Sequence, residues 1–219
     1  MKLIITESQL KKIVQSDLDE DYPQSWNIEE FRNITSFNGR IKYCEENLQR
    51  ISSGSSRIVY KIDETKVLKL AKNKKGLAQN ESEISFSNDY MWGGMVAEVF
   101  EYDNNNLWVE MELATRVSPK EFMSIVGIPF DKYCEGLRFY ESESKPSKYF
   151  KPTKPDIMDE MWENEFTYEI LTLIGSFDVP VGDLCRLNTY GIVKRNNQNT
   201  IVMVDCGLTS DVYDTHYKK

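Results

Sequence analysis

The sequence contains a single histidine, His216, and its cysteines are few and scattered, without a paired C-x-x-C spacing. They are Cys44, Cys134, Cys185 and Cys206. Zinc sites are built mainly from cysteine and histidine side chains that recur at short intervals, so the composition argues against a zinc site. Unpaired cysteines at this low density are typical of free thiols in a reducing compartment.

Long hydrophobic runs are also missing. No apolar stretch approaches the roughly 20 residues that a membrane-spanning helix needs. The opening segment, MKLIITESQLKKIVQ, has too short an apolar part and too many charges for a signal peptide. We therefore expect a soluble protein located in the cytoplasm, with no membrane partner.

The chain also lacks an excess of positive charge. The chain has 27 Lys and Arg against 35 Asp and Glu, a formal net charge of -8. Strong binding to nucleic acids or to anionic membranes depends on Lys and Arg side chains that neutralise phosphates. No nucleic-acid partner is therefore expected, and residues 66–75 (KVLKLAKNKK) are one candidate for a local basic patch.

The residues that are present predict a folded chain. Hydrophobic residues make up 40% and aromatic residues 12%, enough for a core, and 219 residues suit one domain or two small lobes sharing a cleft. Residues 6–15 predict a short amphipathic helix, residues 17–23 (DLDEDYP) interrupt it, and residues 27–47 also favour helix. This helical N-terminal extension either packs onto its own domain or docks onto a protein partner.

From residue 48 the chain changes to short β-type segments, interrupted once by a helix. The expected strands cover residues 48–52, 57–62, 66–70, 96–102 and 107–113, and the expected helix covers residues 79–90. Asp103-Asn104-Asn105-Asn106 provides the turn of a hairpin between the last two strands. The pattern predicts a five-stranded sheet with one helix.

The second half of the chain is mainly helical. A capping box at residues 118–121 predicts a helix start, the proline-rich residues 141–156 predict a surface loop, and residues 158–174 show the strongest helical periodicity. Two short strands are expected at residues 190–194 and 200–204. This half therefore predicts a helical lobe with one small hairpin.

Two polar segments flank this small hairpin. Asp183 precedes Asn188 by five positions, and the second strand runs into Asp205-Cys206-Gly207. The pair resembles the catalytic loop and metal-binding turn of protein-kinase-like phosphotransferases. The resemblance implies that Asp183 orients the acceptor hydroxyl and that Asn188 and Asp205 bind Mg²⁺, the two tasks that phosphoryl transfer sets. The alternative is two unrelated polar loops.

A lysine within an apolar strand adds to the resemblance. Lys69, in Val-Leu-Lys-Leu, resembles the third-strand lysine that pairs with the α- and β-phosphates of ATP in this family. A glutamate of the following helix would hold it; Glu83 and Glu81 are both candidates, and Glu83 is favoured. The alternatives are an edge-strand lysine that reaches solvent and acidic residues that only stabilise the first helical turn.

The loop between the first two strands occupies the place of the family's glycine-rich loop. This loop, Gly54-Ser55-Ser56-Arg57, retains only one glycine of the G-x-G-x-x-G pattern, and Gly54, Ser55 and Ser56 are its candidate binding residues. Backbone amides and serine hydroxyls of this loop are candidates for covering the phosphates. An ordinary hairpin turn explains the same residues.

Three positions depart from the family pattern. Val181 stands where protein kinases usually have histidine, Cys185 replaces the common lysine, and Cys206 replaces the phenylalanine of the Asp-Phe-Gly turn. The acid, amide and acid of the family pattern are all present, as Asp183, Asn188 and Asp205. We interpret the two cysteines as small packing residues rather than redox switches. The short stretch after Gly207 predicts that the activation loop and the helices that bind protein substrates are absent.

The resemblance covers residues 48–210 and implies an α+β, protein-kinase-like two-lobed fold with a reduced helical C-terminal lobe. The expected division is residues 1–47 as helical extension, 48–113 as N-terminal lobe and 114–219 as C-terminal lobe, with a hinge near residues 112–115. The stretches LKLAKNKKGLAQNESE and VMVDCGLTSDVYDTHY also resemble minimal kinase-like proteins encoded by tailed bacteriophages, which would place the protein in the host cytoplasm.

The leading functional hypothesis is an ATP- and Mg²⁺-dependent phosphotransferase. Its acceptor would be a small molecule or a protein docked through the N-terminal extension. One alternative is a pseudokinase, a nucleotide-sensing or protein-interaction module, which the sparse glycine loop and the missing histidine favour. A second is transfer of a nucleotidyl group, and the sequence does not separate it from phosphoryl transfer.

Overall fold

The computed structural model describes Pro23, residues 25–89, Trp92, and residues 94–144, 153–177 and 179–218. The helix expected at residues 6–15 lies outside these described residues. No helix in the described ranges is long and apolar enough to cross a membrane.

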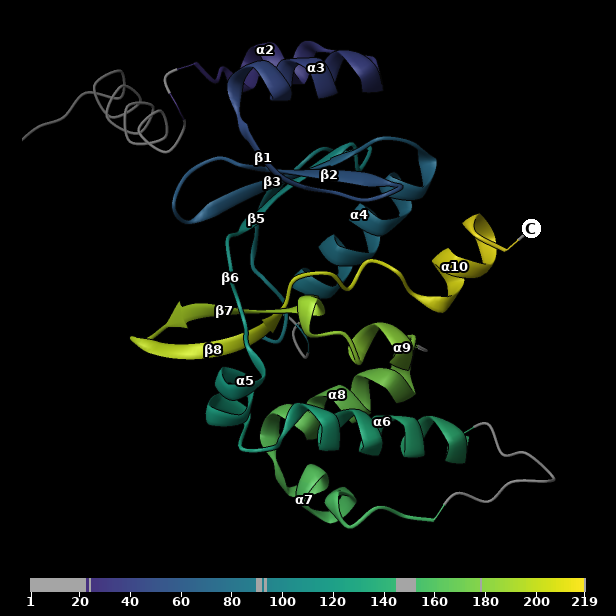
Figure 1. Cartoon of the computed structure of the whole chain (residues 1–219). Helices are drawn as coiled ribbons and strands as arrows, with labels where there is room; N and C mark the ends of the chain where they lie inside the picture. Colours follow the sequence, from purple (N-terminus) through teal and green to yellow (C-terminus); the bar gives the residue numbers. More distant parts are fainter. Residues whose placement is uncertain are drawn as a thin grey trace, which may run out of the picture.

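A five-stranded antiparallel sheet forms the first lobe, in the order β1-β2-β3-β5-β4 (Figure 1). The strands are β1 Gln49–Ser53, β2 Arg57–Lys61, β3 Lys66–Ala71, β4 Val99–Tyr102 and β5 Trp108–Glu112. Lys69 pairs with Val59 on one side and with Val109 on the other, so it lies on the central strand. The alternative of an edge-strand lysine is therefore wrong.

Helices cover both faces of this sheet (Figure 1). Successive side chains of a strand point to opposite faces. Leu68 and Leu70 pack in one apolar cluster with Phe31 and Cys44 of the helices α2 Ile28–Asn33 and α3 Phe37–Asn47. Val67, on the other face, packs in a second cluster that includes Ile84 of α4 Lys74–Asn88. Lys69 shares this second face, which turns toward the other lobe.

Helix α4 begins five residues earlier than the pattern predicted. The side chain of Asn73 accepts hydrogen bonds from the backbone N–H groups of Lys75, at 3.0 Å, and Gly76, at 3.3 Å. An asparagine at this position satisfies amides that have no partner within the helix. The run Asn-Lys-Lys-Gly lacks apolar periodicity, so the prediction missed this first turn.

The second lobe is helical. Its elements are α5 Pro119–Val126, α6 Phe130–Ser144, α7 Ile157–Glu163, α8 Glu165–Phe177, α9 Val181–Leu184 and the 3-10 turn η1 Leu187–Thr189. The capping box at Ser118 and Glu121 is confirmed. Residues 141–144, expected to begin a surface loop, instead complete α6, and residues 145–152 of that expected loop lie outside the described residues.

The prediction of a single helix over residues 158–174 is wrong, because the helix is interrupted at Asn164. This residue has an extended backbone (φ -87°, ψ 124°). Its side chain donates to the carbonyl of Val126 at 2.7 Å and accepts from the N–H of Thr167 at 3.1 Å. Asparagine side chains compete in this way with the helical backbone, and here the competing bond reaches another helix.

A three-stranded sheet lies between the lobes (Figure 1), made of β6 Thr115–Arg116, β7 Tyr190–Arg195 and β8 Gln198–Met203. The turn between β7 and β8 places Asn196 and Asn197 at positive φ (52° and 63°), as tight hairpins prefer. A Cβ atom on Gly191 would lie 2.5 Å from Cβ of Ala114, so only glycine lets the segment leaving β5 cross β7 this closely.

The last helix, α10 Ser210–His216, was not predicted, and it returns to the first lobe, where it contacts α4 (Figure 1). Lys75 Nζ lies 4.1 Å from the ring centroid of Tyr217, a cation–π contact. The Tyr217 hydroxyl also accepts a hydrogen bond from Gln79 at 3.2 Å. The end of the described chain thereby joins the two lobes.

The element order confirms the expected α+β fold class, with a five-stranded sheet and one helix followed by a helical lobe. The division at residues 47 and 113 stays a prediction, although β5 ends at Glu112, close to the expected hinge.

Candidate functional site

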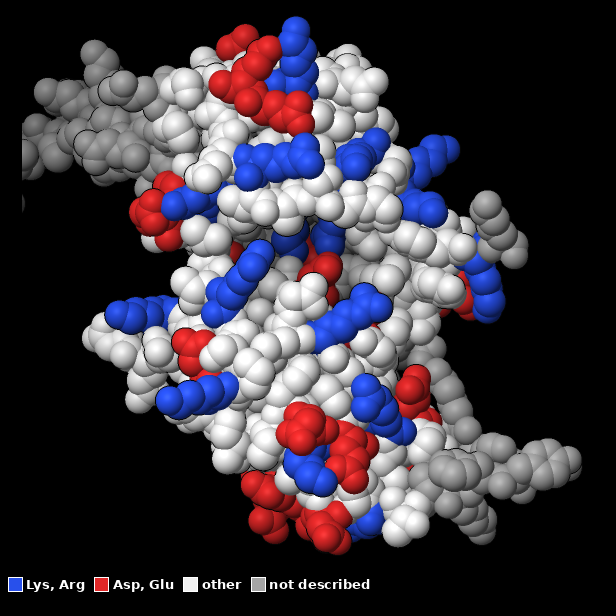
Figure 2. Space-filling model, viewed as in Figure 1, with Lys and Arg blue, Asp and Glu red and all other residues white. Residues whose placement is uncertain are grey.

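A cavity of about 950 Å³ lies between the lobes. Figure 2 shows the hollow on one face of the molecule, with acidic and basic side chains meeting inside it. The sequence analysis singled out residues of both lobes that line it: Gly54, Ser55, Ser56, Lys69, Asp183, Asn188 and Asp205. The fold therefore brings segments more than a hundred residues apart in the chain to one place.

Lys69 is held at the back of this cavity by Glu83. Its Nζ atom lies 2.9 Å from Oε1 and 2.8 Å from Oε2 of Glu83, and it also donates to the carbonyl of Val204. Glu83 is fully buried, whereas Glu81 is exposed, because residues two apart on a helix point in different directions. Of the two candidate partners, the structure pairs Lys69 with Glu83.

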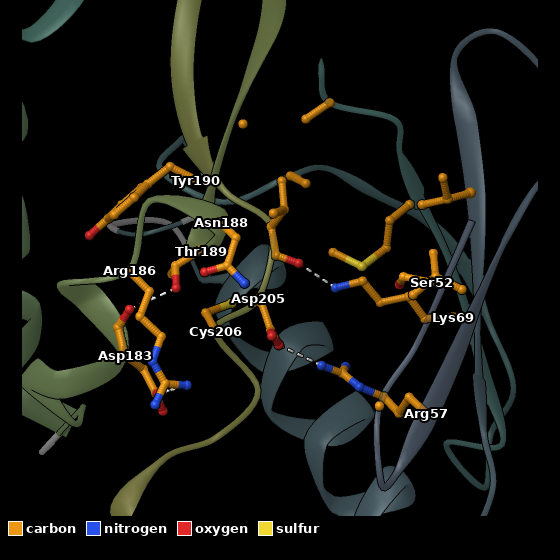
Figure 3. A pocket seen from close by; sticks show the side chains of 18 of the residues that line it. Ser52, Arg57, Lys69, Asp183, Arg186, Asn188, Thr189, Tyr190, Asp205 and Cys206 are labelled. Atoms are coloured by element: carbon orange, nitrogen blue, oxygen red, sulfur yellow. Dashed lines mark hydrogen bonds and ion pairs between the residues drawn. The ribbon is translucent and has the colours of Figure 1, made fainter. Parts of the chain in front are cut away.

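Arg57 is a site residue that the sequence analysis missed. It opens β2, directly after the Gly54–Ser56 loop, and only 8% of the residue is exposed. Its Nη1 atom lies 2.8 Å from Oε2 of Glu83 and its Nη2 atom lies 2.8 Å from Oδ1 of Asp205 (Figure 3). Lys69 was identified as a lysine inside an apolar strand, whereas Arg57 stands at the start of one, and the sequence analysis gave it no role.

Arg57, Lys69, Glu83 and Asp205 form a charge-balanced cluster of two cations and two carboxylates. Burial alone would raise the pKa of Glu83, but Arg57 and Lys69 outweigh it and hold this pKa below its usual value. Burial opposes the charge of Arg57 in the same way, and Glu83 and Asp205 more than compensate, so its pKa is raised. Charges in a low-dielectric interior persist only with such partners, and the buried members Arg57, Lys69 and Glu83 depend on one another.

Asp183 lies on the other side of the cavity, in α9. Its carboxylate is 3.0 Å from Nη1 of Arg186, and its backbone carbonyl accepts a hydrogen bond from the Thr189 hydroxyl at 2.7 Å (Figure 3). Burial raises the pKa of Asp183, and the charge of Asp205 raises it further, while Arg186 opposes the shift. A carboxylate with a raised pKa is a better proton acceptor than an ordinary aspartate.

Removing the Arg186 charge should move the pH dependence of any reaction that needs ionised Asp183. Arg186→Gln removes the influence that lowers the Asp183 pKa, so this pKa rises further. The acid limb of the rate profile of such a reaction is then expected at higher pH than in the wild type. An acid limb that stays in place would show that Asp183 does not limit the rate. Arg138→Gln, an arginine outside the cavity lining, is the matched control.

Asn188 and Asp205 both line the cavity, and their side chains lie near each other in Figure 3. The Asp205 side chain is 63% exposed at the end of β8, and Asn188, in η1, is exposed as well. Within the described part of the chain, no group of three His, Cys, Asp or Glu residues could hold a metal by itself. Mg²⁺ typically takes one or two protein oxygens and completes its shell with phosphates and water, so this donor set fits Mg²⁺ bound together with a nucleotide.

The Gly54–Ser56 loop is tied to the start of α4. Lys72 Nζ donates to the carbonyl of Gly54 at 3.0 Å, and Asn73 donates to that of Ser55 at 3.1 Å. The Ser56 hydroxyl is buried and donates to Gln79 at 2.6 Å. Ser56 is therefore engaged within the protein, and the exposed Ser55 is the serine of the predicted pair that remains available to a ligand.

The residues that depart from the kinase pattern are packed in the protein core. Val181 and Cys206 are buried, and burial raises the pKa of the Cys206 thiol. The Cys185 thiol is half-buried and lies 3.8 Å from the carbonyl oxygen of Cys134.

The hydroxyl of Tyr190 donates to the carbonyl of Leu184 at 3.0 Å and so supports the loop after Asp183.

Comparison with known proteins adds a fold similarity and no family. No protein-family model matches the chain, and no curated protein matches it. Among solved structures, it is similar to the ADP-bound aminoglycoside phosphotransferase APH(2'')-Ib, with 15% identity and a TM-score of 0.33 over 78% of this chain and 69% of the other. The streptomycin–ATP complex of APH(2'')-IIa is 11% identical, with a TM-score of 0.33, over 80% of this chain and 71% of the other.

Proposed function

We propose that this protein is an ATP- and Mg²⁺-dependent phosphotransferase. The supporting observation is the arrangement within one interlobe cavity: the ion-paired Lys69 on one wall, and Asp183 and Asp205 on loops of the opposite lobe. A lysine that is held by a buried glutamate carries a fixed positive charge for phosphate oxygens. Phosphoryl transfer depends almost entirely on such positioning and charge.

Each residue has a distinct task in this proposal. Lys69 binds the α- and β-phosphates, with Glu83 setting the direction of its amine. Asp183 orients the acceptor hydroxyl and takes its proton as the oxygen attacks the terminal phosphorus, while the bond from that phosphorus to the β,γ-bridging oxygen breaks and ADP leaves. Asn188 and Asp205 would hold Mg²⁺, which neutralises charge on the phosphates when it is bound. The acceptor approaches from the Asp183 side of the cavity.

Mg²⁺–ATP is expected to raise the melting temperature of the wild-type protein. A ligand that binds only the folded state adds about 2.7 kcal/mol at a hundredfold excess over Kd. For a chain of this size we expect a shift on the order of 5 °C or more. Asp205→Ala should remove the magnesium-dependent part of the shift, whereas Asp211→Ala, on α10 and outside the cavity lining, should keep it.

The same protein should then be incubated with ATP labelled in either the α- or the γ-phosphate. Label that passes from the γ position to an acceptor, with ADP as the other product, supports phosphoryl transfer. Label that passes from the α position to an acceptor, with pyrophosphate released, supports nucleotidyl transfer. A thermal shift without turnover of either label would favour the pseudokinase alternative. No shift with any nucleotide, with or without metal, would overturn the proposal.

A further inference from the structure

We infer that Arg57 is a second phosphate-binding cation of this site, and that it pairs with Asp205 only until a metal-bound nucleotide arrives. The inference rests on the proposed nucleotide site. It assigns Arg57 two successive partners, the carboxylate of Asp205 in the free protein and phosphate oxygens in the complex.

The first step concerns where the guanidinium lies. Arg57 follows the Gly54–Ser56 loop and lines the cavity, and in Figure 3 its side chain points toward Asp205. Lys69 lies on the neighbouring strand, and both cations contact the same carboxylate, Glu83. A phosphate chain held by Lys69 is therefore also attracted by the positive charge of Arg57.

The second step concerns which contact can change. The contacts of Arg57 with Glu83 and with Asn80, 3.4 Å from Nη1, are buried inside the first lobe. The contact with Asp205 crosses to the other lobe, and the Asp205 side chain is 63% exposed. Releasing Asp205 therefore leaves the arginine anchored by Nη1, with Nη2 directed into the cavity.

The third step is a balance of charge. In the free protein the positive charges of Arg57 and Lys69 match the negative charges of Glu83 and Asp205. A divalent cation that binds Asp205 competes with Arg57 for that carboxylate, and the guanidinium then needs a new anion. Guanidinium groups bind phosphate through paired N–H donors, so the phosphates that accompany the metal supply it.

The test compares Arg57→Gln with wild type in two binding titrations. Mg²⁺–ATP should bind the variant about tenfold more weakly or worse, since a charged phosphate contact is lost. Mn²⁺ without nucleotide should bind the variant more tightly, because the cation that competes for Asp205 is gone. Arg50→Gln, an exposed arginine of β1 outside the cavity, should change neither affinity. A purely structural Arg57 would weaken both ligands together, which would overturn the inference.

Asp205→Asn provides a second arm that does not depend on the folding of Arg57→Gln. It keeps Arg57 and removes the carboxylate that holds it, so metal-free ATP should bind at least as tightly as to wild type. Weaker metal-free binding to Asp205→Asn would overturn the inference. If wild type binds no ATP at all, the proposed nucleotide site itself fails; if it binds ATP and Arg57→Gln binds equally well, only the role of Arg57 fails.

Discussion

Asp183→Asn is expected to lower the rate of phosphoryl transfer by about 10²-fold or more while leaving ATP affinity nearly unchanged. The substitution keeps the shape of the side chain but removes its charge and its ability to accept a proton, and losing a positioned general base has effects of this size. Asp183 faces the acceptor side of the cavity, whereas the nucleotide contacts belong to Lys69 and Asp205 in our proposal. Release of γ-labelled phosphate and ATP-induced thermal shifts measure the two quantities separately.

Two comparison variants make this result interpretable. Lys69→Ala should weaken ATP binding and turnover together, because its proposed partner is the nucleotide. Asp159→Asn, an exposed carboxylate of α7 that pairs with Lys154, should change neither. If Asp183→Asn unfolds the protein while the wild type shows no turnover, Asp183 is a structural carboxylate and the enzyme proposal should be abandoned.

Glu83→Gln is expected to cause the largest loss of stability. The amide keeps the volume of the side chain but leaves Lys69 and Arg57 without the buried carboxylate that both of them contact. Breaking a buried ion pair from one side typically costs about 3–5 kcal/mol. Urea denaturation of Glu83→Gln should show this loss. The matched control is Glu81→Gln, two residues away on the exposed side of α4, which should change the free energy of unfolding by less than about 0.5 kcal/mol.

Glu83→Gln and Glu81→Gln should also differ in how their free energy of unfolding depends on pH. The pKa of Glu83 is lower in the folded protein than in the unfolded chain, so the folded state binds this proton less readily. Its stabilising contribution is therefore complete above the unfolded pKa of about 4.3 and is lost as the pH falls through the folded value. Glu83→Gln should remove this part of the acid destabilisation, and Glu81→Gln should retain it. An equal loss of stability with falling pH in the wild type and both variants would contradict an ionised, ion-paired Glu83.

Local patterns in the sequence identified most of the fold. The strands of the first sheet were predicted to within a few residues, because alternation in a strand and turn residues between strands are local signals. The capping box at Ser118 is likewise local. The break at Asn164 was missed because the bond that stabilises it reaches the carbonyl of Val126, far away in the chain. Helix α10 was missed because its partner is α4 rather than its own neighbours in sequence.

The α+β class could be predicted from local patterns in the sequence, and the candidates Lys69, Asp183, Asn188 and Asp205 from their resemblance to protein-kinase-like motifs. How these residues are connected depends on the tertiary structure. The choice of Glu83 over Glu81 depends on how helix α4 is rotated against the sheet, and the pairing of Arg57 with Asp205 joins residues 148 positions apart. Such contacts arise when two lobes fold against each other and bury their charges together, and a cation buried there must find its anion wherever the chain brings one.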